Sequence, residues 1–278
     1  FDFSRGTSAT YVARDGLIKT SDLQSTNLVQ NGNFSELSSE LVTNGDFATD
    51  SDWIKGTGWS ISGGLASCDG SQSGNTDLTQ IIATSVGKQY KITYTVSNYL
   101  AGSIKIRLNS GNVSISKSSN GTFTETLSGQ GGGFSLRADL DFIGSIDNVS
   151  IKEVGQDWTF VGESELTAQG ARIYSSSGSY SDVNQSNVFT IGNKYKITFN
   201  VISTNGTNLT NNGSTITYDT STTGNKTFYI TASEVELKFK RVAPIATDVT
   251  ITNISVKEIQ VDVPRIDFTD DTTGHLLL

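Results

Sequence analysis

Gly87–Ser97 reads GKQYKITYTVS, and Gly192–Ile202, 105 positions later, reads GNKYKITFNVI. In both copies bulky apolar residues alternate with polar ones, which is the pattern of a β-strand with one buried face. Both copies are also rich in the β-branched and aromatic residues that strands favour. Each copy therefore predicts a central strand of a β-sheet.

The same offset relates four further blocks, which indicates a tandem duplication because chance matches would not share one register. The blocks are Asp52-Trp53 with Asp157-Trp158, Thr122-Phe123 with Thr227-Phe228, Phe134 with Phe239, and residues 148–154 with 253–259. A repeat of about 105 residues is large enough to bury one hydrophobic core. The chain of 278 residues therefore has room for two such units.

The composition argues against several classes of function. The net charge is −8, and no basic run interleaved with aromatic residues occurs, so we expect no nucleic-acid binding. No window approaches the ~18–20 apolar residues of a membrane span, so we expect no membrane insertion. Ser, Thr, Asn and Gly dominate and charged residues make up 17%, as in extracellular or virion all-β proteins. Because methionine is absent, we expect a processed piece or part of a larger chain.

Turn residues divide the chain into short strands at roughly 8–12-residue spacing, which is typical of a sandwich or jelly roll. Asp15-Gly16 between two short extended pieces predicts a β-hairpin near the N-terminus. We predict an all-β fold with two tandem β-sandwich domains inserted into a small β unit. The boundaries are 1–39 for an N-terminal β segment, 40–154 and 155–259 for the two sandwiches, and 260–278 for a C-terminal segment.

A shorter motif also occurs twice. Leu28–Phe34 reads LVQNGNF and Leu41–Phe47 reads LVTNGDF, each with an apolar pair, an Asn-Gly turn and a Phe anchor. We interpret the first copy as a truncated start that is not continued into a domain.

The two ends resemble one family. Residues 3–19 (FSRGTSATYVARDGLIK), 263–268 (VPRIDF) and 274–278 (GHLLL) are similar to a segment of tail and appendage proteins of tailed bacteriophages, where the two halves follow each other closely. The resemblance implies that residues 260–278 pair with 1–39 as one unit with two modules in its loop. It also implies a place in the virion, contacts with other virion proteins, and a homo-oligomer, with a trimer as the expected form.

Residues 40–259 resemble a second family. Asn44–Phe47 (NGDF), a following Trp, the central G-x-x-Y-x-[IV]-[ST] strand and Ile146–Ile151 (IDNVSI) are similar to jelly-roll carbohydrate-binding modules appended to xylanases and glucanases. The resemblance implies a structural calcium in the first module, with Asp46 and Asp147 as ligands. Ala48 stands where the family has Glu, and calcium requires six to eight oxygens. Alternatively, both carboxylates satisfy turn amides.

Sugar recognition needs aromatic faces for the apolar side of a pyranose and polar groups for its hydroxyls. Aromatic residues at equal positions of both repeats (Trp53, Trp158, Tyr90 and Tyr195) are interpreted as core anchors. Aromatic residues without a repeated partner are the candidates for binding a host-surface polysaccharide: Trp59, Tyr99, Tyr174 and Tyr180. Packing at a sheet edge is the alternative for each.

The residues offer little for catalysis, and we expect no enzyme. His275, the only histidine, lies far in sequence from Cys68, the only cysteine, and a nucleophile–base pair would need both to converge. Asp139 and Asp141 have no spacing that marks a glycosidase pair. The sequence therefore favours a phage structural protein that serves adhesion or acts as a spacer. A binding-module segment of a larger polysaccharide-degrading enzyme and a virion decoration without a ligand are the alternatives.

Overall fold

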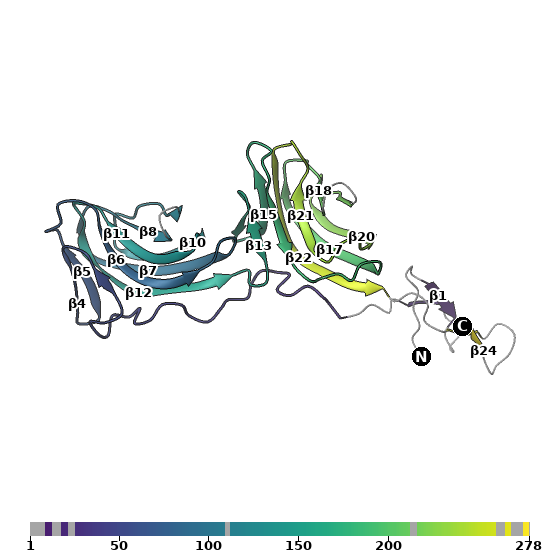
Figure 1. The fold of residues 1–278 in the computed structure, drawn as a ribbon, viewed down its shortest axis with the longest axis horizontal. Helices are drawn as coiled ribbons and strands as arrows, with labels where there is room; N and C mark the ends of the chain where they lie inside the picture. The colour runs from purple at the N-terminus through teal and green to yellow at the C-terminus, as the bar shows by residue number, and fades with distance from the viewer. Residues whose placement is uncertain are drawn as a thin grey trace. The chain divides into compact units, whose positions relative to one another are not determined.

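The computed structural model describes residues 9–12, 18–21, 26–108, 112–211, 216–259, 265–267 and 275–277. These residues form β-strands and no helix (Figure 1), which confirms the all-β prediction. Within them, no helix has the length and apolar character required to cross a membrane. The described chain divides into two compact units, one built mainly from residues 34–161 and the other mainly from 169–278 with the described residues among 1–33. We call the sandwich in the former the first module and the sandwich in the latter the second module.

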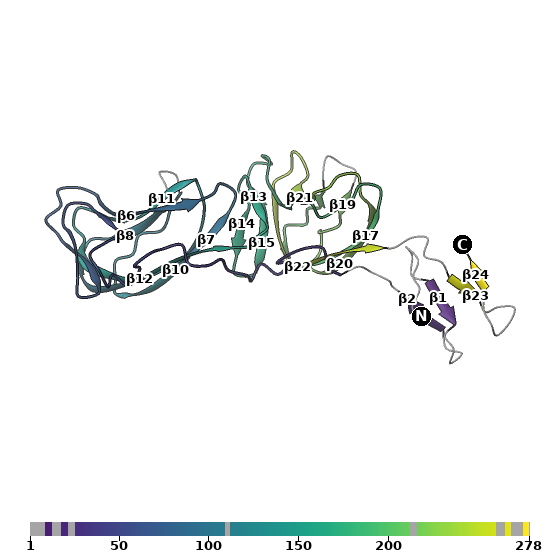
Figure 2. The ribbon, with the colours of Figure 1, turned by 60° about the horizontal axis from the view of Figure 1, so that its bottom comes forward.

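The first module is a sandwich of two five-stranded sheets, of order β10-β7-β12-β5-β4 and β3-β6-β11-β8-β9, which lie as two layers in Figure 2. Its strands are β3 (Ile54–Lys55), β4 (Trp59–Ser62), β5 (Leu65–Asp69), β6 (Thr76–Thr84), β7 (Gln89–Ala101), β8 (Ile104–Leu108), β9 (Asn112–Val113), β10 (Gly121–Ser128), β11 (Gly132–Ala138) and β12 (Ile143–Val154).

The second module repeats this topology strand for strand, with five-stranded sheets of order β20-β17-β22-β15-β14 and β13-β16-β21-β18-β19. Its strands are β13 (Thr159–Val161), β14 (Glu165–Thr167), β15 (Gly170–Ser175), β16 (Asp182–Gln185), β17 (Lys194–Thr204), β18 (Leu209–Thr210), β19 (Thr217–Tyr218), β20 (Gly224–Thr231), β21 (Leu237–Arg241) and β22 (Thr247–Ile259).

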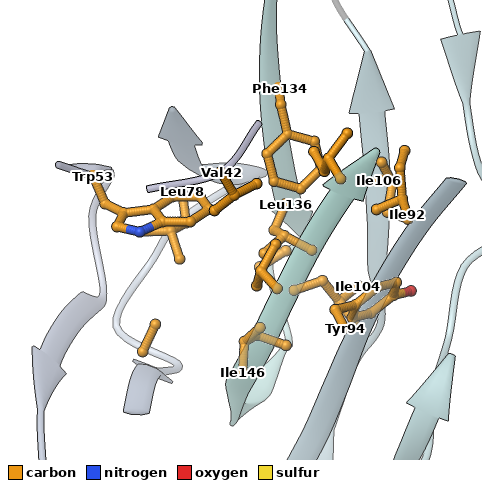
Figure 3. Packing of buried hydrophobic residues seen from close by; sticks show 14 of the residues in the cluster. Val42, Trp53, Leu78, Ile92, Tyr94, Ile104, Ile106, Phe134, Leu136 and Ile146 are labelled. Atoms are coloured by element: carbon orange, nitrogen blue, oxygen red, sulfur yellow. The ribbon is translucent and has the colours of Figure 1, made fainter. Parts of the chain in front are cut away.

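The predicted alternation of buried and non-buried residues in Gly87–Ser97 is confirmed. Tyr90, Ile92, Tyr94 and Val96 of β7 are all at most 2% exposed, and the intervening residues are not buried. Figure 3 shows Ile92 and Tyr94 beside Ile104 and Ile106 of the facing sheet. Trp53 closes one end of this core, with its ring 5.2 Å from that of Phe47. Burial of this apolar face, at roughly 25 cal/mol per Å², is what holds the two sheets together.

The repeat does not keep one register throughout. Lys91 and Lys196, 105 positions apart, pair with Thr126 and Tyr229, which are 103 positions apart. Likewise Phe134 lies opposite Gln80, whereas Leu237 lies opposite Gln185. The matches of Thr122-Phe123 with Thr227-Phe228 and of Phe134 with Phe239 are therefore not structural equivalents. Loops of different length shift these strands by two residues, a shift that preserves the side-chain alternation.

In each module an extended segment, which we call the strap, lies along the last strand of the sandwich: β12 in the first module and β22 in the second. Residues 40–47 lie along β12, where Leu41 N donates to Ile151 O (3.0 Å). Residues 27–33 lie along β22, where Leu28 N donates to Val256 O (2.8 Å). The interpretation of LVQNGNF as a truncated start is therefore wrong. It is the strap of the second module, supplied by the chain before it enters the first.

An Asn-centred β-bulge explains why the strap binds there. Asn148 and Asn253 have φ values of 51° and 54°, in the left-handed region that Asn tolerates. The bulge frees the next amide from the sheet, so Val149 N donates to Gly45 O (2.8 Å) and Ile254 N donates to Gly32 O (2.9 Å). A Cβ at Gly45 would lie 2.1 Å from Val149 O, and a Cβ at Gly32 would lie 2.0 Å from Ile254 O. Glycine is therefore required in each strap.

Side chains fix the straps in matched pairs. Gln80 both accepts from Thr43 N (2.9 Å) and donates to Thr43 O (2.8 Å). Gln185 does the same with Gln30, at 3.0 Å for both bonds. In the first module the Glu40 carboxylate accepts from Ile151 N (2.7 Å) and Ser150 Oγ (2.6 Å).

In the second module a neutral amide takes the place of that carboxylate. Asn27 Oδ1 accepts from Val256 N (2.9 Å) and Ser255 Oγ (3.1 Å). The two straps are therefore held by the same geometry, with a group that carries a charge in one module and no charge in the other.

Near the ends, β1 (Ala9–Val12) pairs with β2 (Ile18–Ser21), which confirms the N-terminal hairpin. β23 (Arg265–Asp267) pairs with β24 (His275–Leu277). Among the described strands these are two separate ribbons. Most of residues 1–25 and 260–278 lies outside the described residues, so the pairing of 260–278 with 1–39 stays a prediction.

Candidate functional site

Trp59 and Tyr99, two of the four proposed sugar-binding aromatics, belong to the packing of the first module. Trp59 is 7% exposed, and its ring lies 6.3 Å from that of Phe142. The Tyr99 ring lies 6.4 Å from Phe142, and its hydroxyl donates to Gly102 O (3.0 Å). Trp59 therefore offers no open face, and Tyr99 is partly buried. The alternative of edge packing is favoured for both, because each ring packs near the buried Phe142.

Tyr174 lies on β15 with one ring face covered. The Arg172 guanidinium is 4.1 Å from the ring centroid, and it also donates to both oxygens of Asp248 (2.8 and 2.7 Å). These bonds lower the pKa of Asp248. A guanidinium held by two such bonds is costly to displace, so Tyr174 is a weak candidate for stacking on a sugar.

Tyr180 is the one proposed aromatic that is exposed, at 46%. It lies two residues before Asp182, the first residue of β16, on the outer face of the sheet that contains β16 and β21. The Lys240 ammonium lies 4.8 Å from its ring centroid. Burial and the neighbouring Asp182 carboxylate raise the pKa of the Tyr180 phenol, which therefore stays protonated at neutral pH as a donor.

Asp182 forms the polar base of this face. It is 1% exposed and accepts from Asn184 Nδ2 at 2.7 Å, whereas its Oδ2 accepts no hydrogen bond from the described residues. Lys240 is its direct partner across the β16–β21 ladder, but the Lys240 ammonium points to the Tyr180 ring. Because that oxygen is itself buried, no ligand reaches it, and Asp182 acts on this face through its interaction with the Tyr180 phenol.

The other cations of β21 are held by neighbours. Lys238 forms an ion pair with Glu236 at 2.7 Å. Burial alone would lower the pKa of Lys238, but Glu236, with Asp182 nearby, raises it. Arg241 Nε donates to Ser179 O at 2.6 Å. We call Tyr180, Asp182, Asn184 and Lys240 the Tyr180 face.

In the first module the carboxylate at the same ladder position has cationic donors. Asp77 on β6 accepts two hydrogen bonds from Arg137 (2.9 and 2.7 Å), and Arg107 lies 3.6 Å away. Asp77 pairs with Arg137 across the ladder as Asp182 pairs with Lys240. Asn75 stands where the second module has Tyr180. The aromatic ring and the free carboxylate oxygen are therefore features of the second module alone.

Sequence reasoning did not single out three relevant residues. Tyr229 on β20 is 60% exposed, and the rule that marked aromatics without a repeated partner applies to it, since Thr126 is its equivalent. Nothing in the sequence marks Asp182 and Lys240 as a pair, because only the pairing of β16 with β21 brings them together. Tyr229 and Tyr180 lie on opposite sheets.

Cys68 is 2% exposed on β5, and burial raises the pKa of its thiol. It donates to Gln72 Oε1 at 3.3 Å, as expected of a structural strand residue. Asp139 accepts from Ser103 Oγ (2.6 Å) and from Asp141 N (3.1 Å), so it holds a turn. His275 has no described side chain.

The two proposed calcium ligands also serve local turns. Asp46 Oδ1 accepts from Ala48 N (3.3 Å), and Asp147 accepts from Asn148 N (2.6 Å). Across the described part of the chain, no three His, Cys, Asp or Glu side chains gather as a metal would require. The two carboxylates alone do not fit a calcium site, and the ion stays a prediction of the family resemblance.

No protein-family model and no curated protein matches the chain. Among solved structures, the tandem CBM22-1–CBM22-2 domains of Paenibacillus barcinonensis Xyn10C align with 80% of this chain and 98% of theirs, at 9% identity and a TM-score of 0.33. A CBM4 structure covers 45% of this chain and 99% of its own at 17% identity and a TM-score of 0.26. An allantoicase covers 84% and 94% at 12% identity and a TM-score of 0.29. Because these scores are low, the fold and the site rest on the chain's own ladders and side chains.

Proposed function

We propose that the chain is a non-catalytic adhesion protein that binds a polysaccharide through the Tyr180 face of the second module. The observation that carries the proposal is an exposed Tyr ring beside the Lys240 ammonium, which forms no ion pair with the described residues. Aromatic faces stack on the apolar side of sugars, and the ammonium can donate to sugar oxygens. No nucleophile–base pair is brought together among the described side chains.

In this proposal the first module does not bind the polysaccharide. Its carboxylate at the matching position is neutralised by Arg137, and Asn75 stands where the second module has Tyr180.

We place the protein on a bacteriophage particle, as part of a tail fibre, spike or similar appendage, in contact with other virion proteins and with itself as a trimer. Support comes from the resemblance of residues 3–19 and 263–278 to phage appendage segments. The second candidate is a binding-module segment of a larger polysaccharide-degrading enzyme, which the same Tyr180 face would serve.

A glycan array tests the binding proposal with the full chain and two variants. We expect Tyr180→Ala to lose the glycans that the natural chain binds, and Tyr229→Ala, an exposed aromatic on the other sheet, to keep them. Each stacked aromatic contributes on the order of 1 kcal/mol, or several-fold in affinity per contact. Binding that survives Tyr180→Ala, or no bound glycan at all, would refute the proposal.

A further inference from the structure

The Tyr180 face is close to neutral on a chain with net charge −8. Lys238 and Glu236 cancel each other as an ion pair, which leaves one anion, Asp182, and one cation, Lys240.

The cation nearest the ring is not neutralised by a carboxylate. Within the part of the chain that the structure describes, the contact of the Lys240 ammonium is the Tyr180 ring, at 4.8 Å, and no ion pair is formed. At the matching position of the first module, Arg137 is fully engaged by Asp77. The two modules thus use one ladder position in different ways, and only the second leaves a cation for a ligand.

The Lys240 ammonium and the Tyr180 ring are complementary in what they can bind. The ammonium donates to an anion, and the ring, which is 46% exposed, offers a stacking surface beside it. Asp182 Oδ2 is buried, so it makes no contact with the ligand. A sugar that carries a carboxylate presents the anion and the apolar face together.

From this arrangement, and resting on the proposed function, we infer that the ligand class is an acidic polysaccharide built from uronic acids. The sugar carboxylate binds Lys240, and the sugar ring stacks on Tyr180. Salt screens the contact between the carboxylate and the ammonium, so binding weakens as salt rises.

The test uses calorimetry on the full chain with oligomers of galacturonate, glucuronate and mannuronate, each beside its carboxyl-reduced, neutral counterpart. We expect at least one uronate to bind, and its neutral counterpart to bind about tenfold more weakly or not at all. Lys240→Gln should weaken uronate binding about tenfold, and Lys240→Arg should restore most of it. Lys105→Gln, on the matching outer face of the first module, serves as the control and should change nothing.

The outcomes separate the two proposals. If a neutral counterpart binds as well as the uronate, or Lys240→Gln has no effect while Tyr180→Ala abolishes binding, the acidic class is wrong and the glycan site stands. If Tyr180→Ala leaves the binding of every oligomer intact, or if neither these oligomers nor any array glycan binds, both proposals fail.

Discussion

Gly32→Ala places a methyl group where the second strap meets its module. The added Cβ would lie 2.0 Å from Ile254 O, whereas carbon and oxygen normally approach to about 3.3 Å. Because Ile254 O belongs to the backbone of β22, the strap has to move by roughly 1 Å. The displaced strap loses the bond from Ile254 N to Gly32 O and the two bonds between Gln185 and Gln30.

Three buried hydrogen bonds at about 1 kcal/mol each give a destabilisation of about 3 kcal/mol. We expect this loss in residues 170–259, although the substitution lies more than a hundred positions earlier. At 1.36 kcal/mol per factor of ten, amides of β22 that exchange by unfolding of this module should exchange roughly 100-fold faster.

Hydrogen exchange followed by mass spectrometry measures this separately for each module. Gly45→Ala is the matched control, because its Cβ would lie 2.1 Å from Val149 O in the first module. It should accelerate exchange in β12 and spare β22. If Gly32→Ala accelerates β12 instead, or leaves both strands unchanged, the assignment of the straps is refuted.

Three further predictions follow from the contacts. Hydrogen bonds from Ser150, Ile151, Val42 and Leu41 hold the pKa of Glu40 below its ordinary value of 4.5, although burial alone would raise it. The stabilising contribution of Glu40 is therefore complete above pH 4.5 and is lost as the pH falls through the lowered pKa. Glu40→Gln should cost about 1 kcal/mol and remove this pH dependence from acid melting curves, whereas Asn27→Asp should add a pH dependence to the second module. Equal acid sensitivity in the natural chain and both variants would contradict this. Trp59→Ala should destabilise the first module by about 3–5 kcal/mol in denaturant unfolding without changing glycan binding, and a loss of binding at unchanged stability would restore Trp59 as a ligand contact. A calcium ion at Asp46 and Asp147 predicts that a chelator lowers the melting temperature of the first module only, and an unchanged curve rejects the ion.

Local pattern predicted the strands and the repeat well. Tyr90, Ile92 and Tyr94 alternate with polar residues, so their burial follows from the two-residue period of a strand. The Trp53 anchor also followed, because an aromatic at equal positions of two repeats has a structural role in both. These features depend on residues close together in the chain.

What the sequence did not reveal depends on distant pairing. LVQNGNF and LVTNGDF are nearly identical, so nothing local tells which module each strap closes. The two-residue change of register in β20 and β21 arises from loop lengths, and matching Phe residues concealed it. Asp182 and Lys240 are 58 positions apart, and only the β16–β21 ladder brings them to one face.

Amide chemical-shift mapping by NMR on the full chain, titrated with an oligosaccharide that binds, tests the central claim most directly. The account predicts that the largest shifts fall on Tyr180–Gln185 and on β21, with β6 and β11 of the first module unchanged. Shifts centred on the first module, or on β17 and β20 of the second, would contradict it.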